Sequence, residues 1–91
     1  LRSALIFMVQ QNQYGGLAIE DPNEHLLHFL EISNTVKVNG VSDDSIRMRL
    51  FPFSLKDKAK QWYQTLVAGS VASWEDLAHK FLYKFFPPGV T

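Results

Sequence analysis

The stretch FPFSLKDKAKQWYQTL, residues 51–66, decides the fold that the sequence predicts. Pro52 lacks a backbone N–H and disfavours helical geometry at the residue before it, so a helix that arrives from upstream ends or kinks there. Ser54 and Asp57 then have the spacing of a capping box, which starts a new helix. Apolar side chains recur at helical spacing beyond this point, and they predict a helix over roughly 55–67.

Three further helices have start signals of their own. Asp21 stands before a proline and three residues before a glutamate, Ser42 stands before two aspartates, and Ser73 lies three residues before an aspartate. The four predicted helices cover residues 22–37, 43–53, 55–67 and 74–86. Their apolar stripes predict a core made of Leu26, Phe29, Leu30, Leu50, Leu55, Trp62, Leu66, Trp74, Leu77, Phe81 and Phe85.

The first 20 residues have a different pattern. The run LIFMV is β-prone, and Tyr14-Gly15-Gly16 is typical of a flexible turn. The sequence therefore predicts an all-α protein, with a compact four-helix bundle in residues 21–91 preceded by an extended arm in residues 1–20 with short strand-like or coil segments. Leu5, Ile6 and Phe7 of this arm are expected to pack either on the bundle or on a partner.

Composition excludes several classes of protein. A length of 91 residues suits one domain, and 46% hydrophobic and 13% aromatic residues argue against disorder. The absence of cysteine removes disulfides, thiolate zinc sites and cysteine nucleophiles. It is compatible with a reducing compartment, and we expect an intracellular, cytoplasmic protein. No apolar run reaches the length of a membrane span, so no membrane partner is expected.

The net charge of zero conceals an uneven distribution. Up to residue 45 the chain has two Lys or Arg against six Asp or Glu, and after it seven against three. The front half thus carries −4 and the rear half +4. Such a dipolar chain could steer head-to-tail association, although an unevenly charged surface without that role explains it equally well.

Candidate sites for chemistry are weak. Lys56, Lys58 and Lys60 flank the apolar stripe on both sides, which favours a solvated surface over a phosphate-binding patch. His25, His28 and Glu31 spread around their helix, and no cluster supplies a fourth ligand. The sequence therefore predicts no metal site, no cofactor and no catalytic residue, and we expect no enzyme.

Four aromatic residues lie outside the predicted stripes or beside the helix break. Tyr83 and Phe86 fall off the stripe of the last helix, and Phe51 and Phe53 surround Pro52. They either pack on the arm or another helix, or they form an exposed contact patch with a partner.

The motifs EDPNEHLLHFLEI (20–32), VNGVSDDSIRMRLFPFSLKDKAKQWYQTL (38–66) and SWEDLAHKFLYKFFPP (73–88) occur in this order. The series resembles the Gag capsid region of plant long-terminal-repeat retrotransposons of the Ty3/gypsy class. The resemblance implies the helical N-terminal lobe of a capsid, which self-associates into virus-like particles around the element's RNA. Its implied partners are further copies of itself and the rest of the Gag polyprotein, with no sequence-specific contact to nucleic acid. The isolated lobe is expected to be a monomer or a weak dimer.

Two other functions stay open at this point. One is a domesticated Gag-like module that binds a host peptide in an apolar groove. The other is a nucleic-acid binder, which strongly salt-dependent binding would reveal.

Overall fold

The computed structural model describes residues 3–87. Within this range the regular structure consists of five α-helices and one 3-10 helix, and no strand is formed, so the all-α prediction is confirmed. The elements are α1 (Ser3–Gln10), α2 (Pro22–Ser33), α3 (Asp43–Leu50), η1 (Phe51–Ser54), α4 (Asp57–Gln64) and α5 (Trp74–Phe85). The count of helices differs from the predicted four because α1 was not expected.

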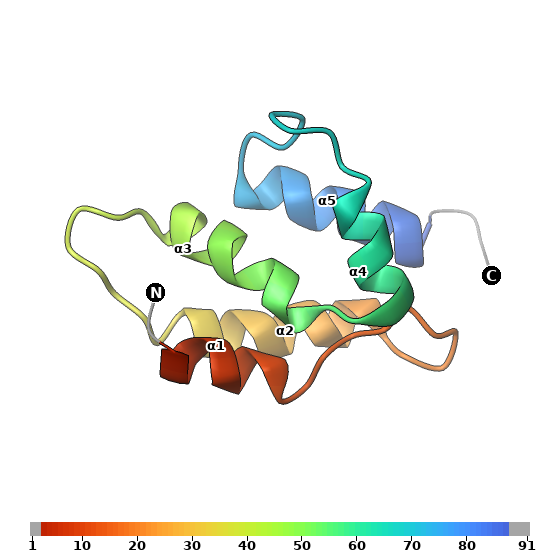
Figure 1. Cartoon of the computed structure of the whole chain (residues 1–91), viewed down its shortest axis with the longest axis horizontal. Helices are drawn as coiled ribbons and strands as arrows, with labels where there is room; N and C mark the ends of the chain where they lie inside the picture. Colours follow the sequence, from red (N-terminus) through yellow and green to blue (C-terminus); the bar gives the residue numbers. More distant parts are fainter. Residues whose placement is uncertain (1–2, 88–91) are drawn as a thin grey trace.

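The helices are arranged around one core. α2, α3 and α5 pack against one another, and α1 lies along α2 and η1 (Figure 1). The Cα radius of gyration is 13.0 Å, close to the ~12 Å that scaling gives for a compact domain of this length. Two pieces of the predicted elements lie outside the residues that the structure describes: residues 1–2 of the arm and residues 88–91 of the helical domain.

Phe51 stands at the centre of the core. Its ring centroid lies 5.2 Å from that of Phe29, 5.3 Å from that of Trp74 and 5.2 Å from that of Phe81, each in an edge-to-face arrangement. These four rings come from η1, α2 and α5, so they join the break at Pro52 to two helices that are distant from it in sequence. Edge-to-face pairs are favourable beyond the apolar area that they bury. The break in the helical pattern therefore supplies the residue around which the helices pack.

The prediction of an extended arm is wrong for residues 3–10, which form α1. A short apolar run cannot be assigned to strand or helix by periodicity alone. Here Leu5, Ile6 and Val9 face the core at helical spacing, and Val9 is buried in it. Packing of one face stabilises a helix too short to form alone.

Beyond α1 the chain runs in an extended conformation against the segment after η1. Tyr14 donates its N–H to the carbonyl of Ser54 at 2.8 Å and accepts from the N–H of Lys56 at 2.9 Å, which makes an isolated parallel bridge to Leu55. The Tyr14 ring is buried, 5.2 Å from the ring of Phe81. Burial raises the pKa of its hydroxyl to about 12, with a smaller contribution from the negative charge of Glu20. With the bond from the N–H of Ala59 to the carbonyl of Gly15 and the bond from the Gln13 amide to the carbonyl of Phe53, residues 13–15 are thus fixed to the core.

This pairing also explains why the predicted capping box at Ser54 is wrong. Leu55 and Lys56 are held extended by the bridge, so α4 begins only at Asp57, with Lys56 as a cap that makes no side-chain hydrogen bond. The Ser54 hydroxyl instead donates to the carbonyl of Phe51 at 2.6 Å and lies 3.1 Å from Nε2 of His25. Because the Ser54 hydroxyl donates its only proton to Phe51, it accepts in the contact with His25, and Nε2 of His25 carries the proton of that hydrogen bond.

Three of the predicted helices are shorter than predicted by three residues or more, and α5 ends one residue early. The observed bounds Pro22–Ser33, Asp43–Leu50 and Asp57–Gln64 replace 22–37, 43–53 and 55–67. α2 ends early where the hydroxyls of Ser33 and Thr35 bond to backbone carbonyls one turn back, at 3.4 and 2.7 Å. Side chains of this type compete with continued helix. Residues 51–53 form a 3-10 turn because Pro52 has no N–H to continue the α pattern.

Candidate protein-interaction surface

A groove of about 780 Å³ lies between α4 and α5, and apolar side chains form most of its wall. It is lined by Trp62, Leu66, Asp76, His79, Lys80, Leu82, Tyr83, Lys84 and Phe86. We call it the α4–α5 groove. Tyr83 and Phe86 lie three residues apart on one side of the helix end, and they are 71% and 61% exposed. Large exposed aromatics gathered at one hollow are typical of a contact surface.

The floor of the groove is fixed to the core. The half-buried ring of Trp62 lies 5.6 Å from the ring of Phe85 and 5.9 Å from that of Phe81. Phe81 is fully buried, so the tryptophan cannot shift without disturbing the packing of α5. The groove is therefore a preformed shape, and a ligand would not have to order it on binding.

The rim of the groove is basic. Lys80 pairs with Asp76 across one helical turn at 3.0 Å. The hydrogen bond from Lys80 holds the pKa of Asp76 below its usual value, with a further contribution from the backbone N–H of Ala72. Lys84 is exposed in the last turn of α5, where the helix dipole favours positive charge. The rim thus carries two lysines against one carboxylate, which suits an acidic ligand.

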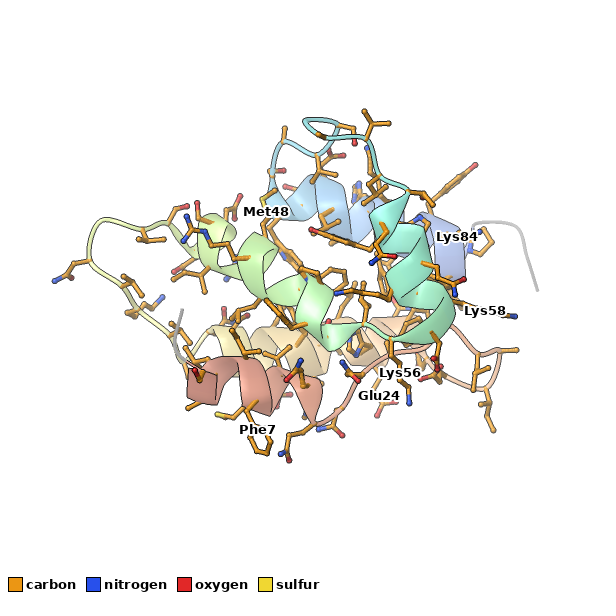
Figure 2. All side chains as sticks on the ribbon, viewed as in Figure 1. Phe7, Glu24, Met48, Lys56, Lys58 and Lys84 are labelled. Atoms are coloured by element: carbon orange, nitrogen blue, oxygen red, sulfur yellow. The ribbon has the colours of Figure 1, made fainter. Side chains whose placement is uncertain are left out.

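The residues of the predicted arm divide between inside and outside. Leu5 and Ile6 are half-buried against the core. Phe7 is 64% exposed and projects from α1 away from the other helices (Figure 2). Met8 beside it is also exposed, and no residue of α1 is charged. α1 therefore carries a small uncharged apolar surface on its outer side.

The aromatic residues around Pro52 are not exposed contacts. Phe51 is fully buried, which excludes the alternative that it binds a partner. Phe53 is half-buried, with the Lys60 ammonium 5.7 Å from its ring centroid and the amide of Gln13 donating to its carbonyl at 3.1 Å. Of the four off-stripe or break aromatics, the structure brings only Tyr83 and Phe86 together at a surface.

The expected core residues lie as follows. Leu26, Phe29, Leu50, Leu55, Trp74, Leu77 and Phe81 are buried, whereas Leu30, Trp62, Leu66 and Phe85 are partly buried and pack against them. Two of the partly buried residues, Trp62 on α4 and Leu66 just after it, are also part of the groove. Core and candidate contact surface therefore share side chains.

The histidines take part in separate polar contacts. His25 is bonded to Ser54, and burial lowers the pKa of its imidazole to about 4, with His28 adding to the effect. His28 lies 3.3 Å from the amide nitrogen of Asn12.

In residues 3–87 no three His, Asp or Glu side chains are grouped so that they could hold a metal ion. None of the helices in that range has both the length and the apolar character needed to cross a membrane.

One exposed feature was missed by the sequence reasoning. Leu17 and Ile19 are 57% and 91% exposed in the loop between α1 and α2. Neither belongs to a periodic stripe, so a search for amphipathic helices passes over them. The available signal was two large apolar residues inside a loop that begins with two glycines, where polar residues are usual.

The fold and the groove together define an all-α domain with its own core and an exposed aromatic groove that is a candidate contact surface. A family model described as the N-terminal capsid-like domain of the retrotransposon-derived protein PEG10 matches residues 9–86, well over half of the chain. The chain belongs to this family, and its Gag-like capsid character is thereby confirmed. Comparison with curated protein sequences and with solved structures gives no significant match to either.

Proposed function

We propose that this domain is the N-terminal capsid lobe of the Gag protein of a plant Ty3/gypsy-class retrotransposon. Copies of it would associate with one another, within full Gag, into a virus-like particle around the element's RNA. Membership of a capsid-like family supports the structural part of this role. The resemblance of the three ordered motifs supports the choice of element.

The observation that carries the proposal is the α4–α5 groove. It is open, mostly apolar and preformed, and only Trp62, Leu66 and Leu82 of its lining also pack against the core. A surface that leaves Tyr83 and Phe86 in water is unfavourable unless something covers it part of the time. A further copy of the lobe is the partner that a capsid role supplies.

Each contact of this kind would be weak. A groove of one helix pair buries far less than the ~1,600 Å² of a standard stable interface. Assembly then depends on many copies, since repeated weak contacts in a closed arrangement reinforce one another. This agrees with the expectation that the isolated lobe is a monomer or a weak dimer. Contact with RNA would be indirect.

Sedimentation velocity of the 91-residue chain tests self-association. We expect the weight-average sedimentation coefficient to rise between micromolar and millimolar concentration, and the rise to be reduced in Tyr83→Ser, which removes an exposed ring from the groove. Val38→Ser, at an exposed position of the α2–α3 loop, is the control, and we expect it to associate like the unmodified chain. Phe53→Ser would not serve, because the Phe53 ring packs on the core. A chain that stays monomeric at millimolar concentration contradicts the proposal.

A further inference from the structure

The loop that joins the Tyr14 bridge to α2 is a rigid projection. The carboxylate of Glu20 accepts the N–H of Gly15 at 3.1 Å and that of Leu17 at 2.8 Å, and the N–H of Glu20 donates to the carbonyl of Leu17 at 3.0 Å. Asp21 caps α2 at the end of the loop. These bonds fix both ends, and the loop extends outward beyond the neighbouring helices (Figure 1). We call residues 17–21 the acidic loop.

The acidic loop presents an apolar tip between negative charges. Ile19 is almost wholly exposed, and Leu17 is more than half exposed. The hollow beside the tip is lined by three acidic residues, Glu20, Asp21 and Glu24, together with His25, His28 and the segment at residues 12–14. A rigid loop loses little conformational entropy when it docks, so it is well suited to insertion. An aliphatic tip with carboxylates beside it is complementary, in shape and in charge, to an aromatic hollow with a basic rim.

The α4–α5 groove has that complementary chemistry. Its walls include Trp62, Leu66, Tyr83 and Phe86, and its rim carries Lys84 and Lys80, the latter paired with Asp76, so the rim is positive overall. The acidic loop belongs to the half of the chain with charge −4, and the groove to the half with charge +4. Two copies of the chain therefore offer each other complementary surfaces.

We propose that the acidic loop of one copy inserts Ile19 into the α4–α5 groove of a second copy, with its carboxylates beside Lys80 and Lys84. The inference rests on the proposed self-association and names the surfaces that perform it. A contact of groove with groove would bring together two rims that each carry two lysines and one carboxylate, and this like net charge is unfavourable. Because loop and groove are different surfaces of one chain, each copy can engage two neighbours, and the contact can repeat around a shell.

Mixing two variants tests this contact. Ile19→Glu removes the tip and leaves the groove intact, whereas Tyr83→Glu spoils the groove and leaves the loop intact. Both positions are exposed, so we expect helical circular dichroism and thermal unfolding to match the unmodified chain. Val38→Glu makes the same chemical change at an exposed site in the α2–α3 loop and serves as the control.

We expect each loop or groove variant alone to associate at least tenfold more weakly than the unmodified chain, and Val38→Glu to associate normally. An equimolar mixture of Ile19→Glu and Tyr83→Glu should form one-to-one dimers, because one intact loop then faces one intact groove. Raising the salt concentration should weaken the association of the unmodified chain, since it screens the carboxylates from the lysines.

A cross-link gives an independent readout, because the chain contains no cysteine of its own. Ile19→Cys mixed with an isotope-labelled Tyr83→Cys chain in a glutathione redox buffer should give a disulfide-linked heterodimer. Ile19→Cys mixed with Val38→Cys should give far less. The heterodimer is counted by mass spectrometry under non-reducing conditions.

The outcomes separate the two proposals. If the unmodified chain never associates, both the capsid function proposed above and this contact are wrong. If it associates and the two glutamate variants associate equally well, the function stands and this contact is wrong. Variants that are weakened alone but not restored by mixing, or cysteines that link Ile19→Cys equally to both partners, also overturn the contact.

Discussion

Replacing Phe51 by alanine tests whether the residue at the helix break organises the fold. Its side chain is fully buried, and three aromatic rings lie within 5.3 Å of its centroid. Truncation of a buried phenylalanine costs about 3–5 kcal/mol. The edge-to-face arrangement with three partners places this site toward the upper end of that range. A domain of this length has a total stability of about 5–14 kcal/mol.

Urea and thermal unfolding followed by helical circular dichroism measure the effect. With about 4–8 °C lost for each kcal/mol in a domain of this size, Phe51→Ala should lower Tm by roughly 12–40 °C. Phe7→Ala is the matched control, because this ring is mostly in water and its loss should change stability by less than about 0.5 kcal/mol. Phe51→Leu keeps part of the volume and remains measurable if the alanine variant does not fold.

The result that refutes the reasoning is a small effect. If Phe51→Ala loses less than about 1 kcal/mol at an unchanged denaturant slope, the ring is not central to the packing of α2 and α5. A loss in Phe7→Ala as large as that in Phe51→Ala would show that the uncharged side of α1 is buried in solution.

Three further changes test separate parts of the structure. Gly16 and Gly40 both have a positive φ, of +90° and +79°, but a Cβ at Gly16 would lie 2.9 Å from a ring carbon of Phe85, whereas a Cβ at Gly40 meets nothing within 4 Å. Gly40→Ala should therefore lower the free energy of unfolding only by the backbone strain, about 1–2 kcal/mol. Gly16→Ala should lower it clearly more, as measured by urea unfolding. Burial lowers the pKa of His25 from 6.5 to about 4 in the folded chain, so the stability due to its neutral form is complete above pH 6.5 and is lost as the pH falls toward 4. In His25→Gln the free energy of unfolding should lack this part of its pH dependence. Parallel pH profiles of the two chains would contradict the lowered pKa. The hydroxyl of Ser73 accepts the N–H of Asp76, in the first turn of α5, at 3.1 Å. Ser73→Ala should therefore lower the free energy of unfolding by about 1 kcal/mol, against no measurable change in the exposed Ser70→Ala.

Local signals predicted the starts of three helices. α2, α3 and α5 begin directly after Asp21, Ser42 and Ser73, and each of these side chains accepts backbone N–H groups in the structure. A cap involves residues within one turn, so the sequence contains all that determines it. The prediction at Ser54 failed for the opposite reason, because Tyr14, distant in sequence, holds the following residues extended.

The candidate surface was predictable only in part. Tyr83 and Phe86 lie off the apolar stripe of their helix, and this pattern shows in the sequence. That Trp62 would form the floor of a groove beside them depends on how α4 crosses α5, which no periodicity encodes. Ile19 was missed because its exposure results from loop hydrogen bonds made by Glu20.

The contact between the start of the chain and the segment after η1 has a consequence during synthesis. Gln13 bonds to the carbonyl of Phe53, 40 residues further along the chain. At the usual speed of a ribosome, those 40 residues take about 2–8 s to be made. Throughout that delay the apolar side of residues 5–9 lacks η1, one of the two elements that it packs on, while other ribosomes on the same messenger produce identical chains nearby. Two nascent copies could each pack residues 5–9 on the other chain and not on their own, and they would then be intertwined. The rate of translation can in this way influence how many lobes leave the polysome already paired.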